Sequence, residues 1–322
     1  MPAPNPFLGR GGAMGLGEET VWGTAVARTV WFALISSSLR RTIEKVPRPV
    51  LAEASASRAR RSHYISKDTC AGTVELLMTY EGCGFLLKHL LHGTPATTGP
   101  VSTIYTHTYK LAGAVPTGGL TIEIGRGTGT NSDGFEGCRI TKGVFKIEAG
   151  GLLRVTLDFI GETVTRGAAG TPSYTTSRDL PVLHSQAAAA TWNAGSIYSK
   201  SAEFTIDNHF AERMLLGSSN SAEPAPSDFL TLECKLSGEW SADTLQTGYA
   251  ADTASDLVLA FTGTGSRVMT LTLHNAYIKD NDGPVNTVGP LPEDTVFVGE
   301  SDGTDEGFQV VIANTASSAT AA

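Results

Sequence analysis

The sequence predicts a mainly β protein, a β-sandwich or barrel with long extended arms and one short flanking helix. Glycine accounts for 36 of the 322 residues, and long runs of Leu, Glu, Lys and Ala at helical spacing are scarce. Residues 153–159 alternate between apolar and polar side chains, which at the two-residue period of a strand gives one apolar and one polar face. The same alternation returns at residues 231–237. Hydrophobic residues make up 41% of the chain, enough for a substantial core.

The first 70 residues are expected to hold an N-terminal arm, the first strand and a long basic loop. The first sixteen or so residues are rich in Pro and Gly, which predicts a flexible arm. Residues 30–35 are mostly apolar and predict a strand. Residues 39–67 have little periodicity and two prolines, so they predict a protruding loop. That loop holds eight Arg or Lys against two Glu, a charge of about +6.

Residues 71–165 are expected to form a first β half. A short helix is predicted over residues 82–92, because its leucines and Phe85 gather near one face and Gly93 follows as a stop. The run at 142–162 flanks Gly150 and Gly151 and predicts one long hairpin with a polar and an apolar side. Further strands are predicted at residues 73–78, 105–111 and 120–124.

Residues 166–192 are rich in Ala, Thr and Pro and are expected to link this half to a second one, residues 193–322. Strands are predicted there at residues 202–207, 229–237, 257–262, 268–274 and 308–312. Residues 280–308 hold eight acids and no Lys or Arg, a charge of about −8. The two halves carry a similar hairpin pattern, but the interruption at 208–227 argues against a strict duplication.

No arrangement of nucleophile, base and orienting group emerges, so the sequence predicts neither a catalytic site nor a bound metal or cofactor. Residues 299–303 match G-x-S-x-G around Ser301, yet a turn and a strand follow instead of the helix that a hydrolase elbow requires. His89 and His92 have zinc-like spacing without a further ligand nearby. The four cysteines contain no C-x-x-C pair and are expected to be buried.

Charge and hydropathy indicate a protein made in a cytoplasm. The net charge is −8 at pH 7, and we expect no membrane span because no apolar run is long enough to cross a bilayer. The N-terminus lacks the features of a signal peptide. The basic loop at 39–67 carries one aromatic residue, Tyr64, which favours a protein contact over nucleic-acid binding.

Several segments, taken in order, resemble the tail tube proteins of tailed bacteriophages. In the first half these are GEETVWGTAV at 17–26, the long arm, residues 71–93, YTHTYKL with LTIEI at 105–124, and the hairpin at 137–162. In the second half they are SIYSKSAEFTID at 196–207, FLTLECKLSGEW at 229–240 and SRVMTLTLHNAYIKDNDGPV at 266–285. The resemblance covers most of the chain.

The resemblance implies a structural virion protein of the phage tail, assembled in the cytoplasm of a bacterial host. In this family, subunits form rings that stack into a hollow tube, and hairpins of neighbouring subunits close into one barrel. Its polar inner face lines the channel for genomic DNA and for the tape-measure protein, and a tail terminator is a further implied partner. Six subunits per ring is the common arrangement, whereas three would suffice if each half is a complete tube unit. Closure also removes exposed strand edges.

Two sets of residues are therefore candidate contact sites. The expected tube-wall residues are Val144, Lys146, Arg154, Thr156, Asp158, Glu233 and Lys235. A contact between stacked rings is expected to join the basic arm to the acidic segment, through Arg40, Arg41, Arg58, Arg60, Arg61, Asp280, Asp282, Glu293 and Asp294. The alternatives are a carbohydrate-binding β-sandwich adhesin, which needs clustered exposed aromatic residues, and a serine hydrolase that uses Ser301.

Overall fold

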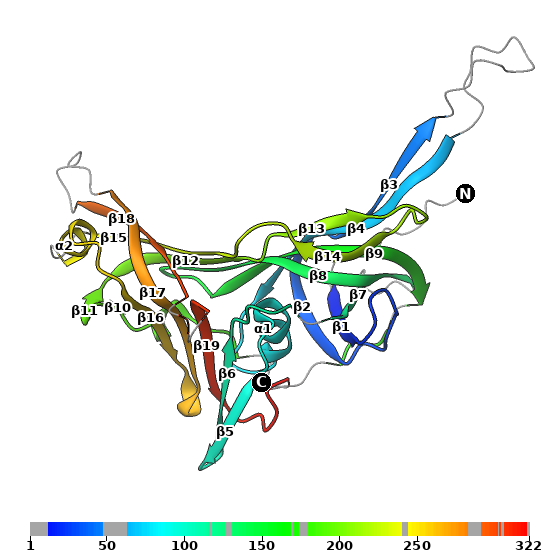
Figure 1. Ribbon diagram of the computed structural model, residues 1–322. Helices are drawn as coiled ribbons and strands as arrows, with labels where there is room; N and C mark the ends of the chain where they lie inside the picture. Colours follow the sequence, from blue (N-terminus) through cyan, green and yellow to red (C-terminus); the bar gives the residue numbers. More distant parts are fainter. Residues whose placement is uncertain are drawn as a thin grey trace, which may run out of the picture.

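The computed structural model describes residues 12–47, 63–115, 117–125, 131–168, 170–173, 180–239, 244–282, 291–301, 303 and 306–320. It is mainly β, as predicted (Figure 1). The N-terminal part contains β1 (Ala13–Glu19), β2 (Val30–Ser37), β3 (Arg40–Pro47), β4 (His63–Leu77), α1 (Gly84–Leu91), β5 (Ala96–Val101), β6 (Ile104–Lys110), β7 (Gly119–Gly125), β8 (Asn131–Glu148) and β9 (Arg154–Ala168). The C-terminal part contains a 3-10 turn (His184–Gln186), β10 (Ala190–Trp192), β11 (Gly195–Ile197), β12 (Ser199–Asp207), β13 (Phe210–Met214), β14 (Ser221–Pro226), β15 (Thr231–Glu239), α2 (Thr244–Ala250), β16 (Ser255–Thr262), a second 3-10 turn (Thr264–Ser266), β17 (Val268–Asp282), β18 (Pro292–Val298) and β19 (Phe308–Asn314).

One antiparallel layer crosses the whole molecule. Its strands follow each other in the order β2 with β3, β4, β9, β8, β12, β15, β18 and β17. In Figure 1 the layer spans the upper part of the molecule, with α1, β6 and β19 below it. We call it the main layer.

The core lies under the main layer. Phe145, Leu157, Phe204 and Cys234 alternate with polar neighbours on adjacent strands, and each is at most 1% exposed. Such burial stabilises the fold by about 1.5–3 kcal/mol for a large apolar side chain. The helix α1 adds Leu90, whose Cδ2 would lie 2.6 Å from a Cβ built on Gly143 of β8. A glycine at that position therefore lets the helix pack directly against the strand.

The helix α1 is confirmed, although its last residue is Leu91 and the left-handed residue that caps it is His92 (φ 61°) and not Gly93. The structure also has α2, which was not predicted. The segment of α2 reads TLQTGYA and buries only Leu245 and Gly248, so it has no apolar stripe of the kind that marks an amphipathic helix.

Two predicted irregular segments are strands. The N-terminal arm is corrected from residue 13 on, because β1 is almost fully buried and pairs with both β2 and β7. The described parts of the basic loop at 39–67 form an antiparallel ribbon of β3 and the first half of β4. This arm projects away from the body (Figure 1). All but one residue of β3 are exposed, so the ribbon lacks the apolar face by which a strand is usually recognised.

Three further segments of the sequence also contain more regular structure than expected. The interruption at 208–227 contains the hairpin β13–β14. The two ends of the predicted linker at 166–192 belong to the strands β9 and β10. The acidic segment at 280–308, for which no strand was predicted before residue 308, includes the end of β17, all of β18 and the first residue of β19.

Candidate functional surface

The two hairpins recognised in the sequence lie side by side in the main layer. The strand β8 of the first hairpin pairs with β12, the first strand of the second pattern, through Glu203 opposite Lys146 and Asp207 opposite Lys142. The strands β9, β8, β12 and β15 therefore form one continuous surface. Its lower side is the core, and we call its upper side the polar face.

All seven expected tube-wall residues lie on this polar face. The pairing aligns them in rows that run across the strands: Arg154, Lys146, Glu203 and Lys235 in one row, and Thr156, Val144, Thr205 and Glu233 in the next. A third row contains Asp158, Lys142, Asp207 and Thr231. The residues between these positions are buried or are Gly143, so the predicted division into a polar and an apolar side holds across all four strands.

Ion pairs connect neighbouring strands on the polar face. Lys146 Nζ lies 3.0 Å from Glu148 Oε1 and 4.0 Å from Glu203 Oε2, and its hydrogen bond to Glu148 raises the pKa of the lysine. Arg154 Nη1 lies 3.0 Å from Glu75 Oε1 on β4. Exposed pairs of this kind contribute only about 0–1 kcal/mol each. Their main effect is to occupy the basic groups with carboxylates of the same surface.

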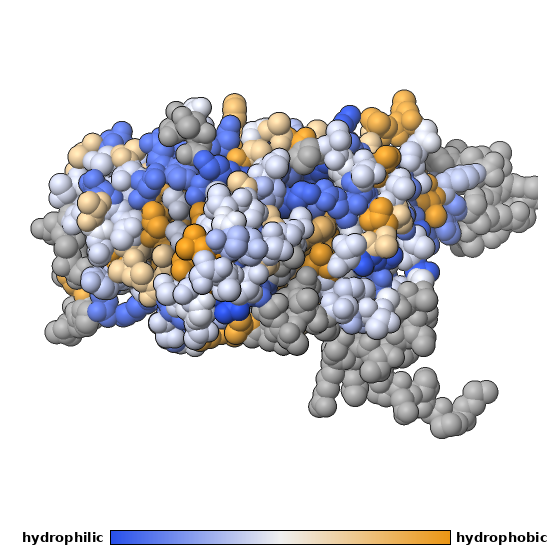
Figure 2. All heavy atoms as spheres, turned by 90° about the horizontal axis from the view of Figure 1, so that it is seen from below, coloured by the Kyte–Doolittle hydropathy of each residue, from blue (hydrophilic) through white to orange (hydrophobic). Residues whose placement is uncertain are grey.

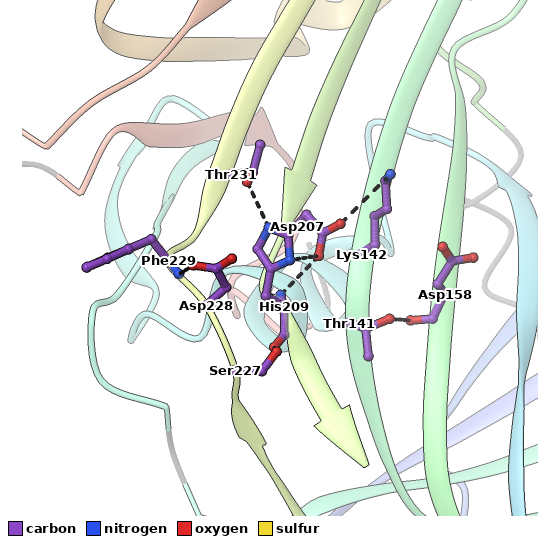
Figure 3. Close-up of polar contacts among 9 residues, drawn as sticks. All are labelled: Thr141, Lys142, Asp158, Asp207, His209, Ser227, Asp228, Phe229 and Thr231. Atoms are coloured by element: carbon purple, nitrogen blue, oxygen red, sulfur yellow. Dashed lines mark hydrogen bonds and ion pairs between the residues drawn. The ribbon is translucent and has the colours of Figure 1, made fainter.

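Hydrogen bonds fix the end of the polar face, where β12 leaves the main layer (Figure 3). One Asp207 oxygen accepts a 3.0 Å bond from the backbone N–H of His209, and the other lies 3.9 Å from Lys142 Nζ. His209 Nε2 lies 2.8 Å from Thr231 Oγ1, where the chain returns as β15. The hairpin β13–β14 is thus held at both of its ends.

A buried arginine anchors β13–β14 to the first half. Arg139 on β8 is 6% exposed and donates hydrogen bonds to Gly118 O (2.7 Å), Pro224 O (3.2 Å) and Glu223 Oε1 (2.7 Å). Its guanidinium also lies over Trp22 and Phe210. Burial lowers the pKa of Arg139. Sequence reasoning missed this residue, because a strand arginine carries no signal that it is buried.

The residues expected to form the contact between stacked rings differ in their surroundings. Arg58, Arg60 and Arg61 lie outside the described residues. Arg41 is paired with Asp68 of its own arm, with Nε 2.7 Å from Oδ1. Arg40, Asp280 and Asp294 are exposed. The basic arm and the acidic strands are at opposite ends of the main layer (Figure 1).

Glu293 does not fit a surface contact. It is 6% exposed, and burial raises the pKa of its carboxyl group. The alternation along β18 turns this side chain towards the interior, whereas its neighbour Asp294 faces outward. A count of acidic residues cannot tell these two positions apart.

Among the described residues, those considered for catalysis, metal binding or sugar binding do not form a common site. Ser301 is exposed between β18 and β19, and its Oγ accepts a 3.2 Å hydrogen bond from Gly303 N, so a strand follows it and not the helix of a nucleophile elbow. The described residues contain no group of three or more His, Cys, Asp or Glu that would hold a metal ion. Trp31 and Trp192 are buried, which leaves the adhesin alternative without their aromatic surfaces.

A family model described as phage tail tube protein matches residues 9–305. No curated protein matches the chain. None of the helices in the described part of the chain combines the length and apolar character needed to cross a membrane.

Proposed function

Since this chain belongs to the phage tail tube protein family, we propose that it polymerises as stacked rings into the tube of a phage tail. The polar face lines the channel through which DNA enters the host. The tape-measure protein occupies the channel before ejection, and a tail terminator closes the growing end. Assembly takes place in the cytoplasm of the bacterial host.

The observation that carries this proposal is the one-sided sheet. The lower side of β9, β8, β12 and β15 is covered by the protein's own core, and their upper side carries the rows of polar residues. An antiparallel sheet of this kind suits a wall between a core and water. Closing such sheets around an axis also satisfies the backbone groups at their edges.

The charge of the polar face supports passage of DNA without capture. The three rows and their ion-pair partners hold six acidic and five basic side chains: Glu75, Glu148, Asp158, Glu203, Asp207 and Glu233 with Lys142, Lys146, Arg154, Lys235 and Lys279. Four of these five cations already lie within 4.0 Å of a carboxylate. Phosphate binding needs available cations, so DNA finds few fixed contacts here.

The arm β3–β4 and the hairpin β13–β14 are the candidate contacts between stacked rings. Both expose large apolar side chains: Ile43, Val46, Tyr64 and Ile65 on β3–β4, and Met214, Leu215 and Leu216 at β13–β14. On the side that would face away from the channel, apolar and hydrophilic residues are instead interspersed (Figure 2). Exposed apolar side chains grouped on these two ribbons favour a protein partner, and the basic residues of β3–β4 and its loop, including Arg58, Arg60 and Arg61, add attraction to an acidic one.

Electron microscopy of the purified protein tests this function directly. We expect negative-stain images to show rings or tubes that become longer as the protein concentration rises. A protein that stays monomeric at every concentration, together with tails that lack this chain in phage-producing cells, would contradict the proposal.

A further inference from the structure

The two halves of the chain repeat one order of elements. The first runs β1, β2, the arm of β3 with the start of β4, then β4, α1, β7, β8 and β9. The second runs β10, β11 with β12, the arm β13–β14, then β15, α2, β16, β17 and β18 with β19. In both halves a hairpin outside the main layer separates the first two strands of that layer, and a short helix follows the second. The first half has β5 and β6 in addition.

The strand pairings repeat as well. The pairs β1–β7, β2–β4, β4–β9 and β7–β8 correspond to β10–β16, β12–β15, β15–β18 and β16–β17. The strand β8 pairs with β9 along nearly its whole length, and β17 pairs in the same sense first with β19 and then with β18. The second half therefore contains the sheet of the first, with one strand divided by residues 299–307.

The repeat can be aligned residue by residue. The last pair of β4 with β9, Leu77 opposite Arg154, corresponds to Glu239 opposite Pro292. The alignment places the buried residues Phe159 and Phe297 at the same position. The alignment also identifies the residues that correspond to those of the two joining strands. Arg40 and Thr42 correspond to Thr205 and Asp207 of β12. Asp280 and Asp282 correspond to Lys142 and Val144 of β8.

The pairing of β8 with β12 joins the two halves of the chain. In the repeat, β8 corresponds to the edge of β17 at residues 277–282, and β12 corresponds to the edge of β2–β3 at residues 36–42. Within the described part of the chain, the first is paired only with β18 and the second only with β4. They form the two opposite ends of the main layer (Figure 1).

We propose that β17 of one subunit pairs with β2–β3 of the next copy, antiparallel and in the register of β8 with β12. This inference rests on the proposed function and names the surfaces that close the ring. Asp282 then lies opposite Arg40, and Asp280 lies opposite Thr42. The new joint has an opposite-charge pair across the strands, which stabilises a sheet, just as Lys142 faces Asp207 inside the chain. Arg40, Asp280 and Asp282 thus act within a ring, and not between rings.

Three subunits supply the six repeats of such a ring. Each chain gives eight strands to the main layer. About 24 strands at a spacing of ~4.8 Å and a tilt of ~40° give a barrel about 50 Å across between backbones. That width leaves room for a DNA duplex inside a wall of side chains, whereas six subunits would double it.

Disulfide trapping tests the pairing. In one chain residues 42 and 280 are at opposite ends of the main layer, so the double variant Thr42→Cys, Asp280→Cys can bridge only between copies. The native cysteines are all buried and give little background. After mild oxidation of assembled protein, we expect a denaturing gel to show linked copies up to three and none larger. Mixing the two single variants should give linked pairs only.

The matched control moves one cysteine by a single position. In Ile43→Cys, Asp280→Cys the side chains point to opposite sides of the shared sheet, so we expect little linkage. Tubes that form normally but link equally in both variants, or in neither, would overturn the pairing and leave the tube intact. Linked species up to six would overturn the count of three.

A charge exchange gives a second readout that needs no cysteine. Arg40→Asp should reduce ring formation at least tenfold, because it places two acids opposite each other. Adding Asp282→Arg should restore it. Failure of the exchange to restore assembly, with the monomer still folded by circular dichroism, would count against this register. Absence of rings from the unmodified protein would instead contradict the proposed function.

Discussion

Adjacent residues of β9 differ sharply in what they tolerate. Leu157 is 1% exposed, so Leu157→Asp places an unpaired charge in the core at a cost of several kcal/mol. Thr156 lies on the polar face, and Thr156→Ser should change the free energy of unfolding by less than about 0.5 kcal/mol. Thermal denaturation and a tube assay measure both effects. Equal behaviour of the two variants would mean that the faces are assigned wrongly.

His89 and His92 make stability depend on pH. Burial lowers the pKa of each from 6.5 to about 4, in surroundings that include Glu18, Lys88 and Arg139. The unfolded chain therefore binds more protons between pH 4 and 6.5, and stability falls as the pH is lowered through that range. We expect a loss of about 3 kcal/mol per histidine.

Urea unfolding at pH 7 and pH 4.5 checks this pH effect. His89→Gln and His92→Asn should each reduce the difference between the two pH values, and Asn tolerates the left-handed conformation at residue 92. His63→Gln, at an exposed position of the arm, is the control and should leave the difference unchanged. If the buried variants kept the full difference, other groups would be responsible for it.

At the scale of elements, the contact between α1 and β8 depends on one glycine. Gly143→Ala would bring a Cβ to 2.6 Å from Leu90 Cδ2, and Leu90 is buried, so its side chain or the helix that carries it must shift. We expect a loss of about 1–3 kcal/mol, seen as a lower melting temperature. Gly167→Ala on β9 meets no atom within 4 Å and serves as the control. Similar melting temperatures would show that Leu90 and its helix accommodate the added methyl group at little cost.

The elements that were predictable from sequence are those whose burial alternates. The strands β8, β9, β12 and β15 were recognised because one side meets the core and the other meets water. The strand β3 and the hairpin β13–β14 were missed because a ribbon outside the core has no such alternation. Short strands such as β10, with three residues, give too few positions for a period to appear.

The polar face could be predicted as a list of residues, but its continuity could not. That β8 lies beside β12 depends on a pairing between residues about 60 apart, which no local pattern contains. The burial of Glu293 and Arg139 likewise depends on elements distant in sequence. The repeat was obscured because the arms, the inserted β5 and β6 and residues 299–307 differ in length between the halves.

At the scale of the whole molecule, the proposed channel should respond to the balance of charge on the polar face. Glu148→Gln, Glu203→Gln and Asp207→Asn together remove the acids within 4.0 Å of Lys146 and Lys142 and leave those cations available to phosphate. We expect assembled tubes of this variant to retain duplex DNA at low salt and to release it as salt rises. Centrifugation of tubes with labelled DNA measures the retention.

Two controls accompany the DNA test. Unmodified tubes should retain little DNA at any salt concentration. Glu300→Gln removes an exposed acid outside the polar face and should behave like the unmodified protein. Equal retention by all three would mean that the polar face does not meet the cargo.

The internal joint between β8 and β12 also bears on the kinetics of assembly. Because the chain itself connects the two strands, this joint forms during folding at an effective concentration that does not depend on how much protein is present. In a ring of three, half of the six joints are of this kind. Each joint between separate molecules costs an estimated 4–15 kcal/mol of translational and rotational freedom, so three fewer encounters lower the reaction order of nucleation. Rings of three subunits would therefore begin to form at concentrations at which six separate subunits would still be monomeric.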